Sequence, residues 1–401
     1  MLAALALTAV YLGGAGADDC DGIAFDRAGH AYLACHSSSD GFMGAGKKDM
    51  DAYVVKFDPR TSKIIYATRI GGSDWDAAFR VVVDAQGAVW VSGGTQSADF
   101  PLESSGRRHF GRGAINAFVA RLDAGGKVEY LAMIGDATAE GLVVAPGGSV
   151  YLSGTKAPNE EKHYAYVAEI QEKGEARILT LGPGTASGIA VDGRGALFAT
   201  GFTGRGAFIA RVGLSEWRQT GFRSIGSADA DRARAVVIDR AGRPHILGTA
   251  VSPGFPARQR LAGKSDVFLA GFDAKLKKLR YATLFGGSSE ELAGFNGESL
   301  QLDSRGDLWI TGLTRSTDLP AQGRFAGVDD GFIASFAPDG RRLRFATYFG
   351  GAGFELLEGL AIAPDGAVWA AGLTSSQGLS ASDHHGGRSD AILVKVTTGG
   401  R

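Results

Sequence analysis

The chain has 401 residues, of which 21% are charged, and its formal net charge at pH 7 is −1. This balance provides no basic field to attract a nucleic acid, and no apolar run approaches the ~18 residues needed for a transmembrane segment. The 61 glycines are many for a globular chain and indicate numerous tight turns.

One short unit recurs seven times along the chain. Each copy is a four-residue turn that ends in glycine, with a short apolar strand on either side, and an aspartate opens five of the seven turns. The seven turn glycines are Gly29, Gly87, Gly148, Gly195, Gly242, Gly306 and Gly366. Successive turns begin about 47 to 64 residues apart, and a period of that length with several strands per unit indicates a propeller.

The second unit illustrates the four strands that we predict in each copy, at 79–84, 88–92, 117–122 and 128–134. These runs are rich in β-branched and aromatic residues and are bounded by turn residues, as strands are. The third strand of each unit carries a large residue that suits the wedge-shaped space between neighbouring sheets. These residues are Tyr53, Phe118, Tyr166, Phe208, Phe268, Phe332 and Ile392. We therefore predict an all-β fold: one seven-bladed β-propeller domain over residues 1–401, with four-stranded antiparallel blades.

The two ends of the chain predict how the ring closes. The last unit stops after its third strand at 391–396, whereas residues 5–14 resemble the fourth strands at 281–287 and 345–351. We expect the N-terminal strand to complete the last blade, since a closed ring hides sheet edges. The alternative is that residues 1–17 are a signal peptide with a small-residue cleavage site, although they lack a basic N-terminal region.

Several short strings recur around the turns and loops. They include Tyr11-Leu-Gly-Gly, Gly22-Ile-Ala-Phe-Asp, Thr95-Gln-Ser-Ala-Asp-Phe-Pro, Asp266-Val-Phe-Leu and Thr314-Arg-Ser-Thr-Asp-Leu-Pro. Together they resemble the SBBP family of seven-bladed β-propeller repeats over essentially the whole chain, although the third and fourth units lack the Ser-x-Asp-Phe-Pro stretch. The resemblance implies a bacterial propeller that is extracellular, periplasmic or at the cell surface, and it supplies no catalytic motif.

The chain has two cysteines, Cys20 and Cys35, and both lie in the first unit. They are placed symmetrically about the turn Asp26–Gly29, so an antiparallel hairpin would bring them opposite each other. We predict a cross-strand disulfide, which implies an oxidising compartment. The alternative is a pair of unpaired buried thiols in a cytosolic protein, because a β-bulge in the hairpin would spoil the register.

The predicted strand order places the loops after the second and fourth strands of every unit on one face of the ring. The loops after the second strands are long, for example 95–115, 250–265 and 314–329, and we name this side the long-loop face. Long loops on a rigid scaffold usually carry the binding function. We predict a monomeric binding or scaffold module without catalysis, which takes a protein or glycan ligand on this face.

Carboxylates and histidines gather on the same face. One interpretation is an acidic mouth that binds Ca²⁺, the candidate cofactor, since clustered oxygens suit hard cations. The other is that these acids only form hydrogen bonds within turns; neither EF-hand spacing nor a His-x-x-x-His pair is present. The candidate metal ligands are Asp18, Asp19, Asp21, Glu140, Glu298, Glu358, His36, His384 and His385.

An enzymatic alternative rests on a second, weaker resemblance. The strings Val89-Trp90, Leu308-Trp309 and Val368-Trp369 are loosely similar to streptogramin-lyase-like propellers. That resemblance implies a metal-dependent lyase or hydrolase with its site at the mouth of the central channel. Such an enzyme needs a metal and a catalytic histidine, and the sequence identifies neither, so we predict no catalytic residue.

Overall fold

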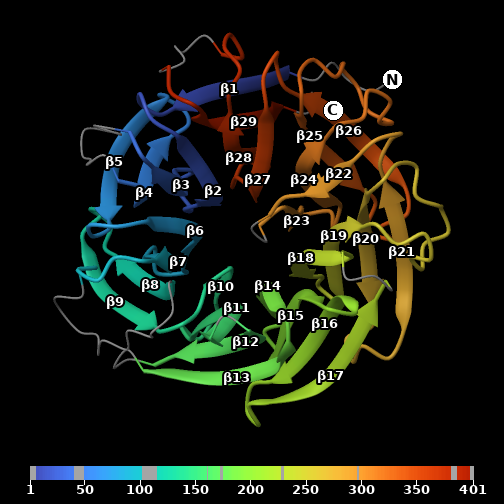
Figure 1. Cartoon of the computed structure of the whole chain (residues 1–401), viewed down its shortest axis with the longest axis horizontal. Helices are drawn as coiled ribbons and strands as arrows, with labels where there is room; N and C mark the ends of the chain where they lie inside the picture. The colour runs from blue at the N-terminus through green and yellow to red at the C-terminus, as the bar shows by residue number, and fades with distance from the viewer. Residues whose placement is uncertain are drawn as a thin grey trace.

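A computed structural model describes residues 6–39, 49–101, 115–159, 161–171, 175–226, 230–295, 298–380 and 386–397. These residues form seven antiparallel sheets arranged as blades around a central axis (Figure 1). The predicted seven-bladed β-propeller is therefore confirmed. Among the described residues, no helix is long and apolar enough to cross a membrane.

Each blade follows the chain from the centre of the ring outward. Blade 1 is β2 (Asp18–Phe25), β3 (Ala31–Ser37), β4 (Asp51–Asp58) and β5 (Lys63–Ile70), and blade 2 is β6 (Asp76–Val83), β7 (Val89–Thr95), β8 (Asn116–Leu122) and β9 (Val128–Ile134). Blade 3 is β10 (Gly141–Val144), β11 (Val150–Asn159), β12 (Lys162–Ile170) and β13 (Ala176–Pro183), and blade 4 is β14 (Thr185–Val191), β15 (Ala196–Thr203), β16 (Gly206–Gly213) and β17 (Arg218–Ile225).

The remaining blades include two departures from this plan. Blade 5 is regular, with β18 (Arg232–Ile238), β19 (Pro244–Ala250), β20 (Asp266–Phe272) and β21 (Leu279–Phe285). Blade 6 has a divided inner strand, β22 (Glu291–Ala293) and β23 (Leu300–Leu302), followed by β24 (Leu308–Thr314), β25 (Asp330–Phe336) and β26 (Leu343–Phe349). Blade 7 is β27 (Glu355–Ile362), β28 (Val368–Thr374) and β29 (Asp390–Thr397), with β1 (Ala6–Leu12) as its outer strand.

The ring closes through β1, which pairs antiparallel with β29 along its length (Figure 1). Tyr11 lies opposite Ile392 in this pairing. Its hydroxyl donates to the carbonyl of Ser376 at 2.8 Å and accepts the backbone N–H of Leu379 at 2.9 Å. The structure thus confirms that the N-terminal strand completes the last blade, where a pairing edge would otherwise be exposed.

The repeated turn has a local physical cause. All seven turn glycines have a positive φ, between 77° and 93°, a conformation that glycine adopts without steric cost. In blade 2, Oδ1 of Asp84 accepts the backbone N–H groups of Gln86 and Ala88, both at 2.9 Å, and Oδ2 accepts the indole N–H of Trp90 at 3.2 Å. The aspartate therefore fixes the turn and also the aromatic side chain that follows it.

Seven apolar clusters hold the blades together, one at each boundary between neighbouring blades. The large residues predicted on the third strands are all buried in them. Phe118, for example, packs with Tyr32 of blade 1 and with Phe100, whose ring centroid is 5.1 Å away. The wedge between adjacent sheets is filled by these side chains, as the repeat predicts.

A β-bulge interrupts the pairing of the first two strands in five blades. The register shifts by one residue between Cys20 and Gly22, Ala78 and Arg80, Ala186 and Gly188, Ala233 and Ala235, and Leu357 and Gly359. A bulge leaves one extra residue unpaired and redirects its side chain. The side chains of these extra residues on the innermost strands therefore point in directions that regular strand alternation would not give.

The disulfide between Cys20 and Cys35 is confirmed, and the two cysteines are direct partners across β2 and β3. The bulge makes this pairing possible. Near the turn Ile23 pairs with Leu33, and continuing that register would place Cys20 opposite His36. The extra residue, Asp21, shifts the register by one and restores Cys35 as the partner. The bulge that was expected to endanger the disulfide is the reason that it forms.

Candidate sites in the central channel and on the long-loop face

Charged residues from six blades approach the axis of the ring. Asp21, Arg234 and Glu358 are the extra residues of their bulges, and Arg80 directly follows one. Glu140 immediately precedes β10, and Glu298 lies between the two halves of the inner strand of blade 6. The charge of Arg80 acts on four carboxylates from different blades, namely Glu298, Asp21, Glu140 and Glu358. The inner strands that carry these side chains surround the central axis of the ring (Figure 1), and their charges therefore act on one another.

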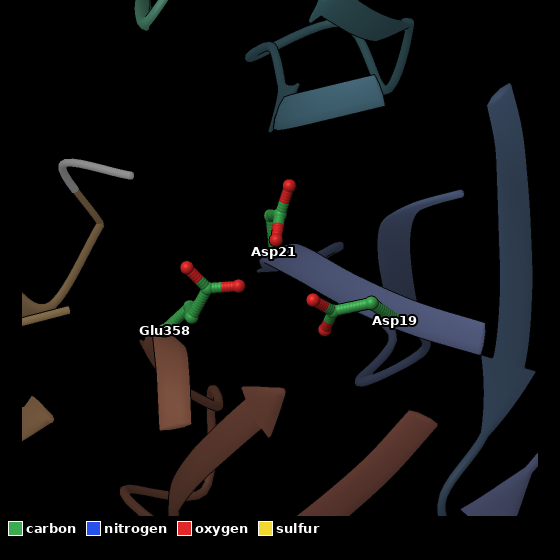
Figure 2. Close-up of side chains that lie close together, drawn as sticks. All are labelled: Asp19, Asp21 and Glu358. Carbon is green, nitrogen blue, oxygen red and sulfur yellow. The ribbon is translucent and has the colours of Figure 1, made fainter. Parts of the chain in front are cut away.

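Three carboxylates converge at the seam between blades 7 and 1. Asp19 and Asp21 come from β2, and Glu358 comes from the bulge of β27 (Figure 2). One oxygen from each of the three lies within 4.8 Å of the other two. Their exposed fractions are only 8%, 1% and 3%, respectively. Within the described ranges, this is the single place where three potential metal-binding side chains meet so closely.

The proximity of these like charges changes their protonation. Burial raises the pKa of Asp19 well above its usual range, and the charge of Glu358 adds to the shift. Burial likewise raises the pKa of Glu358, with a further contribution from Asp21. Both effects disfavour the ionised form, since a buried carboxylate loses water and gains repulsion. Asp19 and Glu358 therefore hold protons more readily than solvent-exposed carboxyl groups do.

Arg80 and Glu298 lie beside this cluster. The carboxylate of Glu298 accepts the backbone N–H of Ile23 at 3.1 Å, and burial raises its pKa to about 7 despite the charge of Arg80. Arg80 is fully buried and donates to the carbonyl of Phe79 at 2.7 Å. Its Nη2 atom has no hydrogen-bond partner among the described residues. Arg80 thus compensates the acidic channel as a neighbouring charge, without a direct ion pair.

Two other predicted ligands serve as hydrogen-bond acceptors within the framework. Asp18 accepts the backbone N–H of Gly14 at 2.7 Å and the hydroxyls of Ser37 and Ser39. Oε1 of Glu140 accepts the hydroxyl of Thr138 at 3.1 Å, and its Oε2 accepts the hydroxyl of Ser187 at 3.0 Å. The structure does not bring either of these acids into the three-carboxylate cluster.

The predicted histidine ligands divide between described and undescribed residues. His36 lies opposite Asp19 in the β2–β3 pairing, and its Nδ1 is 3.6 Å from Oδ2 of Asp21. Burial lowers the pKa of His36 to about 4, so its imidazole is neutral near pH 7. His384 and His385 lie outside the described residues.

A cavity of about 410 Å³ opens on the long-loop face between blades 5 and 6. Arg232, Arg234 and Lys264 line it together with Glu290 and Phe295. Phe295 is 38% exposed, and the guanidinium of Arg234 lies 5.6 Å from the centroid of its ring. A concave site with convergent charges and an aromatic side chain is typical of ligand binding. The sequence did not identify Phe295; its signal is the insertion that divides the inner strand of blade 6.

A second cavity, of about 510 Å³, lies on the opposite face of the same two blades. Its lining includes Asp239, Arg243 and Asp303. These groups already form local contacts, since Arg243 donates to Asp239 at 2.6 Å and Asp303 accepts the backbone N–H of Arg305 at 2.8 Å. The cavity on the long-loop face is therefore the better candidate for an external ligand.

Two solved structures are similar to this chain at low sequence identity. A protein of unknown function from Dyadobacter fermentans DSM 18053 is 13% identical with a TM-score of 0.49, and the match covers 83% of this chain and 99% of that one. The beta-propeller domain of Cps50 (Swd1) from Myceliophteria thermophila is 11% identical with a TM-score of 0.53, and the match covers 98% and 99%. No family model and no curated protein matches the chain. The chain is thus similar in fold to a known propeller, whereas its relation to the SBBP repeats stays a prediction.

Proposed function

We propose that this chain is a non-catalytic binding module of SBBP type, exported and associated with a bacterial cell surface, which captures an acidic glycan on its long-loop face. The cavity lined by Arg232, Arg234, Lys264 and Phe295 carries this proposal. The disulfide between Cys20 and Cys35 supports export, because such bonds persist in oxidising compartments.

The lining of the cavity favours a sugar that carries carboxylates. Guanidinium groups bind carboxylates with a planar pair of donors, and an exposed aromatic ring offers an apolar face for a sugar ring. Arg232 and Arg234 both lie over the ring of Phe202, at 4.6 and 5.6 Å from its centroid, so that aromatic contacts support both guanidinium groups. No observation on the described residues favours a lyase or hydrolase at the channel mouth.

Calorimetric titration with a galacturonic acid oligosaccharide tests the proposal, and a neutral galactose oligosaccharide of the same length serves as the reference ligand. The double variant Arg232→Ala/Lys264→Ala removes two exposed charges from the cavity. We expect its affinity for the acidic sugar to fall by at least tenfold, since a charge-assisted hydrogen bond contributes about 1.5–3 kcal/mol. Glu290 keeps Arg315 as an ionic partner in this variant.

The matched control is Arg27→Ala/Lys127→Ala, which removes the same charge from exposed turns on the opposite face. It should bind the acidic sugar as the unaltered protein does. Equal losses in both double variants would show a general charge effect and overturn the assigned site. Binding of an acidic peptide in preference to either sugar would overturn the glycan and leave a protein as the partner.

A further inference from the structure

The seam between blades 7 and 1 holds an excess of buried negative charge. Asp21 and Glu358 occupy the same bulge position in adjacent inner strands, and Asp19 precedes Asp21 by two residues on β2. In a regular strand, residues i and i+2 lie on the same side of the sheet. The bulge makes Asp21 an unpaired residue between Cys20 and Gly22, so regular alternation does not determine the direction of its side chain. The carboxylates of Asp19 and Glu358 point toward each other across the seam, and that of Asp21 lies beside them (Figure 2).

Hydrogen bonds link the side chain of Glu358 to those of Asp19 and Asp21, and such contacts between acids require a shared proton or a cation. Arg80 is the nearby cation, and it acts at the same time on Glu298 and Glu140. The direct hydrogen bond of its guanidinium goes to the carbonyl of Phe79. A buried charge is costly unless it is paired or coordinates a metal. Asp19, Asp21 and Glu358 therefore need a further cation if all three are ionised.

One atom gives this need a specific place. Oδ1 of Asp19 is buried and has no hydrogen-bond partner in the part of the chain that the structure describes. The carboxylate of Asp19 points toward Glu358, into the space that the three acids surround (Figure 2). A buried acceptor without a donor is rare in native proteins and indicates a missing water or ion.

We propose that Asp19, Asp21 and Glu358 form a calcium site that joins the inner strands of blades 1 and 7. All three donors are carboxylate oxygens, which suit a hard cation. One oxygen from each acid lies within 4.8 Å of the other two, so a single ion can contact all three. Donors from two different strands suit the adaptable coordination of Ca²⁺, with bonds of about 2.3–2.6 Å, better than the near-ideal octahedron that Mg²⁺ requires. Water completes the coordination, since the protein supplies three ligands.

The site has a structural consequence for the ring. β27 belongs to the blade that β1 completes, and β2 begins the next blade. An ion between them fastens the inner edge of the seam, where β1 and β29 close the outer part of the same blade. Ca²⁺ binding should therefore stabilise the closed propeller, since a ligand that binds only the folded state raises its stability.

Isothermal titration calorimetry with CaCl₂ on protein first treated with EDTA tests the site. We expect one Ca²⁺ per chain, a melting temperature that rises with Ca²⁺ concentration, and weaker binding of Mg²⁺. The variants Asp19→Asn and Glu358→Gln keep the side-chain volume and should each lower the Ca²⁺ affinity at least tenfold. Glu129→Gln, an exposed acid on β9, is the matched control and should leave the affinity unchanged.

Folding of each variant is checked by circular dichroism and by the protection of both cysteines from alkylation, so that a misfolded variant is recognised. A second measurement, terbium luminescence displaced by Ca²⁺, applies to the unaltered protein and needs no variant. No stoichiometric Ca²⁺ binding by either method, or equal affinity in Glu358→Gln and Glu129→Gln, overturns the proposal.

Discussion

Two sets of buried carboxylates differ in how their oxygens are satisfied. Glu291 and Glu355 are the first residues of the inner strands β22 and β27. Glu291 accepts the backbone N–H of Gly287 and Glu355 accepts that of Gly351, both at 2.8 Å. Each also accepts a threonine hydroxyl at 2.6 to 2.7 Å. At the seam, by contrast, Asp19 has an oxygen without a partner and lies against two further acids. Residues of the same type and similar burial therefore have different roles.

The comparison shows that burial alone does not identify a binding site. The strand-start acids fasten loops to blades, because their acceptors match donors that the fold already holds nearby. The seam acids meet other acceptors instead, so their arrangement is complete only with a proton or an added cation. The number of donors within reach separates Glu291 and Glu355 from the proposed site.

Removal of the disulfide should have the largest effect on stability, and it also affects the acids at the seam. Cys20 lies between Asp19 and Asp21 on β2, so its bond to Cys35 holds the strand that carries both acids. Replacing both cysteines by alanine should lower the free energy of unfolding by about 3 kcal/mol, the value expected for a loop of this length. It should also weaken Ca²⁺ binding. Urea unfolding measures the first effect and calorimetry measures the second.

Dithiothreitol gives the control for this pair of substitutions. It should destabilise the unaltered protein toward the value of the alanine variant and leave the variant itself unmoved. If the unaltered protein and the variant have the same urea midpoint under oxidising conditions, the prediction is contradicted.

The pH dependence of Glu298 gives the next largest effect. Its folded-state pKa is raised from 4.5 to about 7, so the folded state binds a proton more tightly than the unfolded state does. The stabilisation is therefore complete below pH 4.5 and is lost as the pH rises through 7. As the pH rises from 5 to 8, the free energy of unfolding of Glu298→Gln should increase by roughly 2 kcal/mol relative to that of the unaltered protein, since one pKa unit corresponds to ~1.4 kcal/mol.

Thermal or urea unfolding of both proteins at several pH values, in EDTA, measures this difference. The groups that face Glu298 are Arg80 and the backbone N–H groups of Ile23 and Val81, with Asp21 and Glu358 nearby. His36 has a lowered pKa of about 4 and opposes the trend in absolute stability, but it is common to both proteins and cancels. A difference that does not change with pH would sink the prediction.

A matched substitution at the two sites gives the smallest effect. Glu355→Gln replaces one carboxylate oxygen by an amide NH₂ group, which then faces a donor, either the N–H of Gly351 or the hydroxyl of Thr374. Because a buried donor loses its acceptor, the free energy of unfolding should fall by about 1–2 kcal/mol. Glu358→Gln in EDTA should be neutral or stabilising, since it removes repulsion within the cluster. Urea unfolding of the two variants in parallel measures both values. Equal destabilisation would show that the two sets of acids do not differ.

Much of the fold follows from local sequence patterns. The turn aspartates and glycines, the alternating apolar strands and the large residue on each third strand predict seven blades because each feature acts within a few residues or between adjacent repeats. The disulfide was predicted from symmetry about one turn. Its partners were right, yet the hairpin register near the turn differs by one residue, and the bulge at Asp21 corrects it.

The site was only partly predictable. The nine candidate ligands included Asp19, Asp21 and Glu358, but nothing in their spacing separated them from Asp18 or Glu140, which the fold supplies with donors. The cavity that Phe295 and Arg232 line depends on how the loops of blades 5 and 6 meet. The sequence of one repeat unit does not specify how its loops contact those of the next unit.

The repeat, the number of blades, the turns and the closing strand follow directly from the order of residues, because they depend on periodicity and local backbone preference. Which buried acids meet depends on the assembled fold, because a bulge of one residue in β2 and another in β27 changes which side chains face the seam. Donors and charges that are distant in sequence then determine whether each carboxylate is satisfied, and that balance separates framework acids from the proposed calcium site.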